Sequence, residues 1–284
     1  MVYTLTMRGA MLVRERDLGD HEDSGPRPLP APDRLLRWGR PILLPLSSAM
    51  RVVTTDKVLA LSYDDGPHPE HTGEILAELA ARGIRATFFV LTDAAERHPD
   101  LVRAMVAAGH EIGLHGVDHT MLTQVRWWQA ARAVLTGRRR LERITGRRVR
   151  LYRPTYGAQG LAQFLAARLA GMEVAYWTVW ARDWEDAPAP EVAARAVRAS
   201  HPGAVILLHD VTEDTMDGAR AAGSPAALPT FSRGEVTALV LDGLLAEGYR
   251  VDTVGHLLAT HPVVRAVTTH RPWRALRGPP RSVG

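Results

Sequence analysis

The feature that most restricts the fold of this chain is a regular alternation of short apolar runs and longer amphipathic segments between residues 58 and 253. The apolar runs have the length of strands, and the longer segments have the length and periodicity of helices. The expected strands are 58–63, 85–91, 110–114, 149–152, 173–179, 204–208 and 249–253. The expected helices are 70–82, 99–108, 123–145, 158–170, 189–200 and 234–247.

Seven strands that alternate with helices predict a parallel sheet whose faces are covered by helices. A closed barrel and a doubly wound open sheet both satisfy this alternation. Polar side chains follow several different strands, and this distribution favours a barrel, in which the chemistry gathers where the strands end. We therefore expect an α/β fold of the barrel type.

The composition limits the kinds of site that the chain can build. It has 284 residues, no cysteine and 12 histidines, so no disulfide can form and a transition metal would have to bind His, Asp or Glu. The net charge of +4 arises from scattered arginines, whose densest clusters lie within 138–148 and 271–281. Because these clusters hold too few aromatic residues for base stacking, we interpret them as a solvated helix face and a loose tail and expect no nucleic-acid partner.

Three parts of the chain differ in composition. Residues 1–50 contain a stretch rich in proline and charge, which is typical of an extended linker. The alternating pattern occupies 51–260, and 261–284 form a basic tail. The irregular connection 211–233 is expected to be a loop beside the active site, and a disordered connection is the alternative. No segment has the apolar length of a signal peptide or a membrane span, so we expect a cytoplasmic protein that does not cross a membrane.

Two adjacent carboxylates, Asp64 and Asp65, follow the apolar run 58–63 and precede a Gly-Pro pair. Neighbouring like charges repel, and such a pair fits a site in which one carboxylate binds a cation while the other handles a proton. The alternative is an ordinary Asp-Gly turn.

Polar residues also follow four other expected strands. His115 and His119 have a spacing at which both imidazoles can face one metal, and Asp65 would add an oxygen ligand and leave positions open for water and substrate. Two surface histidines near a helix start are the alternative. Arg153 could hold a carboxylate anionic, and His209 could donate a proton near neutral pH. Taken singly, these two residues also suit a structural ion pair and a buried, hydrogen-bonded histidine.

Five segments in order resemble the motifs of the polysaccharide deacetylase family, the NodB-homology domain, across residues 56–260. They are Ser62-Tyr-Asp64-Asp65-Gly-Pro67, His115-Gly-Val-Asp-His119, Arg153-Pro-Thr-Tyr156, Asp183-Trp184 and Leu207-Leu-His209. The resemblance implies a distorted (β/α)7 barrel. It also implies metal-dependent hydrolysis of an N-acetyl or other N-acyl amide, in most members on an amino sugar, and makes 51–260 the catalytic domain.

The resemblance also implies a role for each matching residue. Asp64 would be the general base and His209 the general acid, while Asp65, His115 and His119 would bind the metal.

Supporting roles are implied for five further residues. Arg153 would pair with the base, and Asp183 would tune either Arg153 or His209. The Tyr156 backbone N–H would face the oxyanion, and Trp184 with Leu207 would line the acyl pocket.

Four positions depart from the family pattern. Tyr63 stands in place of Phe, Gly116 in place of Ser or Thr, and Thr120 in place of Pro. Trp180 stands where many members carry an acidic residue, so the cleft is expected to differ in shape.

The expected function is N-deacylation that depends on a divalent metal. Zn²⁺ is the metal we expect, and Co²⁺, Ni²⁺ and Fe²⁺ are alternatives. A cytoplasmic location favours an N-acylated amino sugar in soluble or carrier-linked form as the substrate. The alternatives are an exported deacetylase of peptidoglycan or chitin-type polysaccharide and a catalytically silent homologue that binds glycans. The sequence predicts no oligomeric state.

Overall fold

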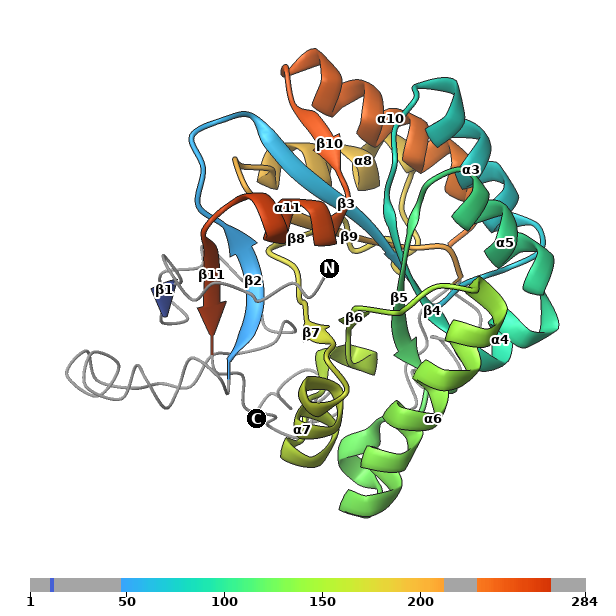
Figure 1. The fold of residues 1–284 in the computed structure, drawn as a ribbon. Coiled ribbons are helices and arrows are strands. Elements are labelled where there is room, and N and C mark those ends of the chain that lie inside the picture. The colour runs from blue at the N-terminus through green and yellow to red at the C-terminus, as the bar shows by residue number, and fades with distance from the viewer. Residues whose placement is uncertain (1–10, 13–46, 212–228, 267–284) are drawn as a thin grey trace, which may run out of the picture.

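The computed structural model describes residues 11–12, 47–211 and 229–266. These residues fold around one parallel sheet that curls into a half-barrel with helices around it (Figure 1). Its strands are β3 (Val58–Asp64), β4 (Thr87–Leu91), β5 (Glu111–Gly116), β6 (Leu151–Tyr152), β7 (Glu173–Val174), β8 (Val179–Trp180), β9 (Val205–His209) and β10 (Arg250–Asp252). The strand order is β7-β6-β5-β4-β3-β9-β8, and β10 pairs with the first half of β3.

Helices connect most of these strands and cover the sheet. They are α3 (His71–Ala81), α4 (Thr92–Arg97), α5 (Pro99–Ala107), α6 (Trp127–Thr145), α7 (Leu161–Leu169), α8 (Ala189–Ala199), α10 (Arg233–Ala246) and α11 (Val254–Thr260). Two short 3-10 helices, η2 (Leu122–Gln124) and η3 (Thr155–Gly157), precede α6 and α7. No helix in these described ranges is long and apolar enough to cross a membrane.

Strand β3 lies in the middle of the sheet and carries the first motif at its carboxyl end. All seven of its residues are buried. A strand that is covered on both faces needs a continuous apolar run, and residues 58–61 provide one. The backbone of β3 pairs with β4 on one side and with β9 on the other. The ends of these three strands are therefore held at adjacent positions along one edge of the sheet.

The six predicted helices are all present within a few residues of their expected bounds, but the single strand predicted over 173–179 is wrong. The structure divides it into β7 and β8, which lie at opposite ends of the sheet. The intervening residues cross between the two ends, where the carbonyls of Ala175 and Tyr176 accept hydrogen bonds from the Arg153 side chain. The chain thus turns out of the sheet at Ala175 and bridges its two edges.

A small second sheet joins the two ends of the described chain. It consists of β1 (Met11–Leu12), β11 (Val263–Ala266) and β2 (Ser48–Val52), with β11 antiparallel to β2. These strands, with α4 and α11, were not predicted. The division into 1–50, 51–260 and 261–284 stays a prediction, and most of the expected linker, tail and 211–233 loop lies outside the described residues.

Candidate active site

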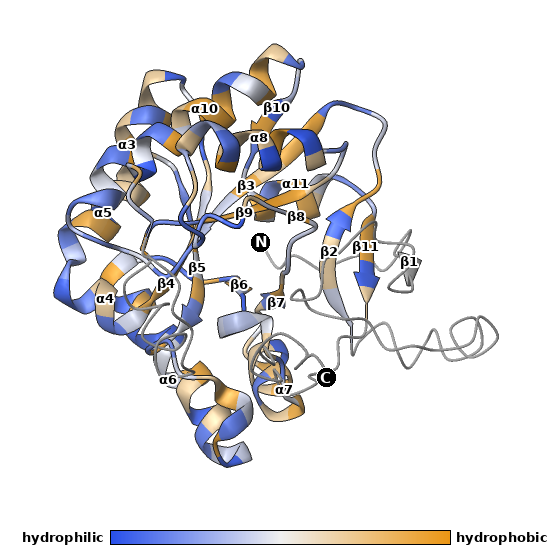
Figure 2. Ribbon diagram, turned by 180° about the vertical axis from the view of Figure 1, so that it is seen from behind, coloured by the Kyte–Doolittle hydropathy of each residue, from blue (hydrophilic) through white to orange (hydrophobic). Residues whose placement is uncertain are grey.

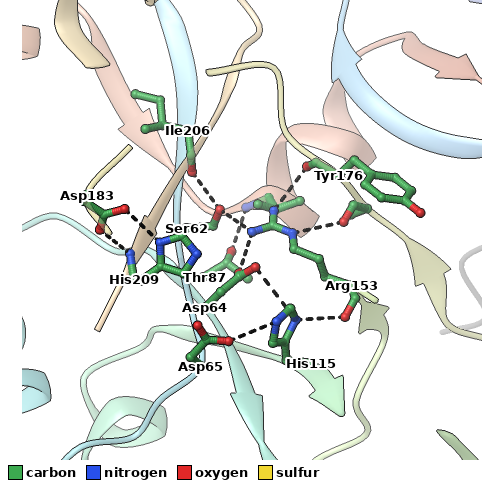
Figure 3. A network of polar contacts seen from close by, with 12 residues as sticks. Ser62, Asp64, Asp65, Thr87, His115, Arg153, Tyr176, Asp183, Ile206 and His209 are labelled. Carbon is green, nitrogen blue, oxygen red and sulfur yellow. Dashed lines mark hydrogen bonds and ion pairs between the residues drawn. The ribbon is translucent and has the colours of Figure 1, made fainter. Parts of the chain in front are cut away.

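The predicted site residues gather at the carboxyl ends of the central strands (Figure 3). Asp64 is the last residue of β3, His115 lies near the end of β5, and His209 is the last residue of β9. Arg153 directly follows β6. Because these strands are parallel and neighbouring, residues distant in the sequence arrive at one edge of the sheet.

Asp65, His115 and His119 form a compact cluster. Oδ1 of Asp65 lies 3.1 Å from Nε2 of His115 and 3.0 Å from Nε2 of His119. The Asp65 backbone has φ 80°, an uncommon value for a residue other than glycine, and it follows the end of the β3 ladder. The turn at the end of β3 therefore places this carboxylate between the two imidazoles.

The cluster fits a divalent cation. Both carboxylate oxygens of Asp65 are buried and have no hydrogen-bond partner among the described residues, which is costly for a charged group unless something compensates it. Three ligand atoms, one oxygen and two nitrogens, lie within 4.8 Å of one another. That donor set is common for catalytic transition metals.

His115 is oriented by the backbone. Its Nδ1 lies 2.9 Å from the carbonyl oxygen of Arg153, which can only accept a hydrogen bond, so Nδ1 donates to it. The lone pair of the neutral ring is then on Nε2, the atom that faces Asp65. Burial tends to lower the pKa of His115, but the charges of Asp64 and Asp65 raise it overall.

Asp64 and Arg153 form a buried ion pair. Nη1 of Arg153 donates to Oδ1 of Asp64 at 2.7 Å and to Oγ of Ser62 at 2.9 Å. The other guanidinium nitrogens donate to the Ala175 and Tyr176 carbonyls. Burial lowers the pKa of Arg153, and Asp64 opposes that shift. The guanidinium is thus fixed on several sides and holds one oxygen of Asp64 in place.

The resemblance implied that Asp183 tunes either Arg153 or His209. In the structure, Asp183 contacts His209. Its Oδ1 lies 2.8 Å from Nδ1 of His209, and its Oδ2 accepts a hydrogen bond from the His209 backbone N–H at 2.7 Å. Burial tends to lower the pKa of His209, but Asp183 overcomes this effect and the pKa rises to about 9. His209 is therefore predominantly an imidazolium at neutral pH.

Arg233 is part of this group, although the sequence analysis did not identify it. Its Nη1 donates to the Asp183 carbonyl at 2.8 Å and to Oδ2 of Asp183 at 2.9 Å. The side chain is buried at the first turn of α10. Burial tends to raise the pKa of Asp183, but His209 and Arg233 lower it overall. A positive charge at the start of a helix after an irregular segment gives no sequence signal for such a contact.

Asp210 is a buried acid to which the sequence analysis gave no role. Its Oδ2 accepts a hydrogen bond from Oγ1 of Thr72 at 2.7 Å, and its Oδ1 has no partner among the described residues. Burial raises its pKa to about 7. The carboxyl packs against Gly66, where a Cβ atom would collide with Oδ2 of Asp210. This contact explains why a residue without a side chain follows Asp65.

Aromatic and apolar residues lie around the polar groups. The Tyr156 ring is centred 4.2 Å from the His119 ring, and the Tyr156 backbone has φ 58° in η3. Trp184 packs edge-on against His209 at 5.6 Å and contacts Trp180 at 4.9 Å. Leu207 is buried on β9 beside Trp180 of β8. Trp180, one of the departures from the family pattern, therefore stands next to the residues implied to line the acyl pocket.

Comparison with known proteins identifies the family. A family model described as polysaccharide deacetylase matches residues 51–175. The chain is 30% identical over 210 residues to a peptidoglycan-N-acetylglucosamine deacetylase of Bacillus cereus, and the match covers 73% of this chain and 91% of that relative. This chain belongs to the polysaccharide deacetylase family. The distorted (β/α)7 barrel is thereby confirmed as its fold.

Two further proteins resemble this chain, one in sequence and one in fold. The chain is 34% identical over 163 residues to the peptidoglycan-N-acetylmuramic acid deacetylase PdaC of Bacillus subtilis. The match covers 57% of this chain but only 34% of that relative. The chain thus spans about a third of the length that PdaC has. A CE4 family pseudoenzyme of Bacillus anthracis shares the fold with a TM-score of 0.63 and 23% identity, over 74% of this chain and 68% of its own.

Proposed function

We propose that this protein hydrolyses the N-acetyl, or another N-acyl, amide of an amino sugar with the help of a divalent metal. The observation that carries the proposal is the buried carboxylate of Asp65, which lies about 3 Å from two imidazole nitrogens and has no hydrogen-bond partner in the described part of the chain. Asp64 and His209 supply a candidate base and acid beside it.

Asp65, His115 and His119 would hold the metal. When bound, a divalent cation polarises the amide carbonyl and acidifies water. One carboxylate and two imidazoles suit Zn²⁺, which we propose as the resident ion, but they also accept Co²⁺, Ni²⁺ and Fe²⁺. The hydrogen bond from His115 Nδ1 to the Arg153 carbonyl keeps the other ring nitrogen aimed at the ion site.

Asp64 would take the proton from the attacking water. Its Oδ1 is held by Arg153 at 2.7 Å, so that the carboxylate keeps one orientation and its second oxygen remains for the proton transfer. The cost of burying Asp64 is offset by the charge of Arg153, which is itself held by backbone carbonyls.

His209 would give a proton to the leaving amine, since an unprotonated amine is a poor leaving group. With its pKa near 9, the ring carries that proton at neutral pH. Asp183 holds the ring in one orientation, and Arg233 holds Asp183. The backbone N–H of Tyr156 as an oxyanion donor, and Trp184 with Leu207 as the acyl pocket, stay predictions from the motifs.

Acetate release tests the proposal. The panel contains N-acetylglucosamine, a nucleotide-linked N-acetylglucosamine, a chitooligomer and a peptidoglycan fragment. The last two represent the exported-polymer alternative, and the first two represent the intracellular substrate that we propose for a cytoplasmic enzyme. We expect release from at least one substrate, loss of release with a chelator and recovery with Zn²⁺. Glycan binding by the zinc-loaded protein without any release would contradict the proposal and favour the silent homologue.

A further inference from the structure

Helices α6 and α7 present an apolar and strongly basic surface, and we propose that this surface binds an anionic lipid bilayer. We call it the α6–α7 face and define it by the exposed side chains Trp127, Trp128, Leu135, Leu161, Leu165 and Leu169. The proposal goes beyond the proposed function, because it concerns where the protein binds and not which bond it hydrolyses.

The apolar residues of this face form stripes. Leu161, Leu165 and Leu169 recur every four residues, so they lie on one side of α7, with 67%, 39% and 88% of their surface exposed. Trp128 and Leu135 are seven residues apart and share one side of α6. The two helices pack side by side (Figure 1), and both show hydrophobic turns among hydrophilic ones (Figure 2).

The clustering is specific to this part of the described surface. Eight large hydrophobic side chains are exposed among the residues that the structure describes, and six of them belong to this face. Single exposed apolar residues are ordinary, but a contiguous group of them indicates a binding surface.

The charge of the same segment favours an anionic partner. Residues 121–170 contain eleven arginines and one acidic residue, Glu142, whereas the rest of the chain has more acidic than basic side chains. Arg132, Arg139 and Arg143 are exposed along α6, and Glu142 is already paired with Arg138. Arginine beside Trp and Leu on a surface helix is the pattern of helices that lie in the interface of anionic membranes.

Other occupants fit this face less well. A second copy docked through it would bring two basic surfaces together, and like charges would oppose the contact. A single-stranded nucleic acid would use the arginines and the two tryptophans but would leave the leucine stripe of α7 without a partner. A bilayer accommodates both features, since its headgroups bind the arginines and its acyl boundary takes up the leucines.

The face adjoins the candidate active site. Helix α6 begins at Trp127, eight residues after His119, and α7 begins at Leu161, five residues after Tyr156. The rings of His119 and Tyr156 are 4.2 Å apart. The amino-terminal end of the α6–α7 face therefore follows directly on the segments that carry His119 and Tyr156, an arrangement suited to an amide on a lipid-carried or membrane-proximal substrate.

Vesicle co-sedimentation of the full chain tests the proposal. The vesicles are pure phosphatidylcholine and phosphatidylcholine with about 30% phosphatidylglycerol, an anionic lipid content that attracts basic surfaces. We expect binding to the anionic vesicles only. Arg132→Gln/Arg139→Gln/Arg143→Gln should weaken it by roughly a hundredfold, and Leu165→Ser/Leu169→Ser by about tenfold or more. The matched control is Leu245→Ser, an exposed leucine on α10, which should bind as the wild type does.

Three results would overturn the proposal. They are the absence of vesicle binding, binding that the Leu165→Ser/Leu169→Ser variant retains in full, and a solution dimer that this variant dissociates. Circular dichroism checks that each variant is folded. We expect every variant to fold, because substitutions at exposed positions usually change stability little. All variants should release acetate from a soluble substrate at the wild-type rate, so failure of the membrane proposal is distinguishable from failure of the proposed function.

Discussion

Arg153 and Asp64 form an ion pair in which Nη1 lies 2.7 Å from Oδ1 and both side chains are buried. The same guanidinium donates to two backbone carbonyls of the segment that bridges β7 and β8. One side chain thus links the candidate base to the closure of the half-barrel. Stability and catalysis should both depend on it.

Arg153→Gln should destabilise the protein and stop acetate release. Removal of one partner leaves Asp64 as an uncompensated buried charge, which costs about 3 to 5 kcal/mol. Thermal unfolding with and without the substitution measures the cost. The matched control is Arg103→Gln, because Arg103 pairs with Asp100 at an exposed site, where a pair contributes about 0 to 1 kcal/mol. Equal losses from the two substitutions would contradict this account of Arg153.

His119→Ala should lose bound metal while the protein stays folded, since His119 is one of only three candidate ligands in the described cluster. Metal content by mass spectrometry after dialysis against Zn²⁺ checks the prediction. His256→Ala, which changes an exposed histidine of α11, is the control and should keep the wild-type zinc content. Unchanged zinc in His119→Ala would remove this residue from the site.

Asp183→Asn should lower the pH at which activity declines on the alkaline side. In the wild type, Asp183 overcomes the effect of burial and raises the pKa of His209 to about 9, so we expect the acid to remain protonated up to that pH. Without the charge of Asp183, the pKa should fall toward or below the ordinary value of about 6.5. A pH profile of kcat measures the shift, and an unmoved alkaline limb would contradict the role of Asp183.

The ion pair between Asp183 and His209 also affects the stability of the fold. Because the folded-state pKa of His209 is raised, its contribution to stability is fully present below about pH 6.5 and is lost as the pH rises through about 9. Chemical denaturation between pH 6 and pH 10 should therefore show a decline in the wild type that is smaller in Asp183→Asn.

Arg233→Gln should lower kcat with little change in KM. Arg233 touches Asp183 and not the proposed metal ligands, so we infer that it positions the acid. General acid catalysis contributes about 100- to 10,000-fold, and partial misplacement should lose a fraction of that. Loss of the arginine removes a positive charge near His209, so the alkaline limb should not move down, in contrast to Asp183→Asn. Arg233→Lys should recover part of the activity, and a change in KM alone would contradict this role.

The sequence predicted the strand ends better than the contacts between them. Asp64, Asp65, His115 and His119 lie in short local motifs, and parallel strands bring such ends together whatever the details of packing. Arg233 follows His209 by more than twenty residues and reaches Asp183 only through the packing of α10, so no local pattern identifies it.

The break within 173–179 was equally inaccessible to sequence patterns. Its apolar residues have the composition of one continuous strand. Where the strand is interrupted, the buried Arg153 side chain donates hydrogen bonds to the carbonyls of Ala175 and Tyr176. This contact links residues more than twenty positions apart, and tertiary interactions of this kind commonly outweigh local propensity in strands.

We propose that the two adjacent aspartates have separate roles, in which Asp65 binds the metal and Asp64 takes the proton. Zinc content and acetate release, measured together on Asp64→Asn and Asp65→Asn, separate these two roles. We expect Asp64→Asn to keep its zinc and lose nearly all turnover, and Asp65→Asn to lose both. Zinc loss in Asp64→Asn together with full retention in Asp65→Asn, or turnover that survives in Asp64→Asn, would contradict it.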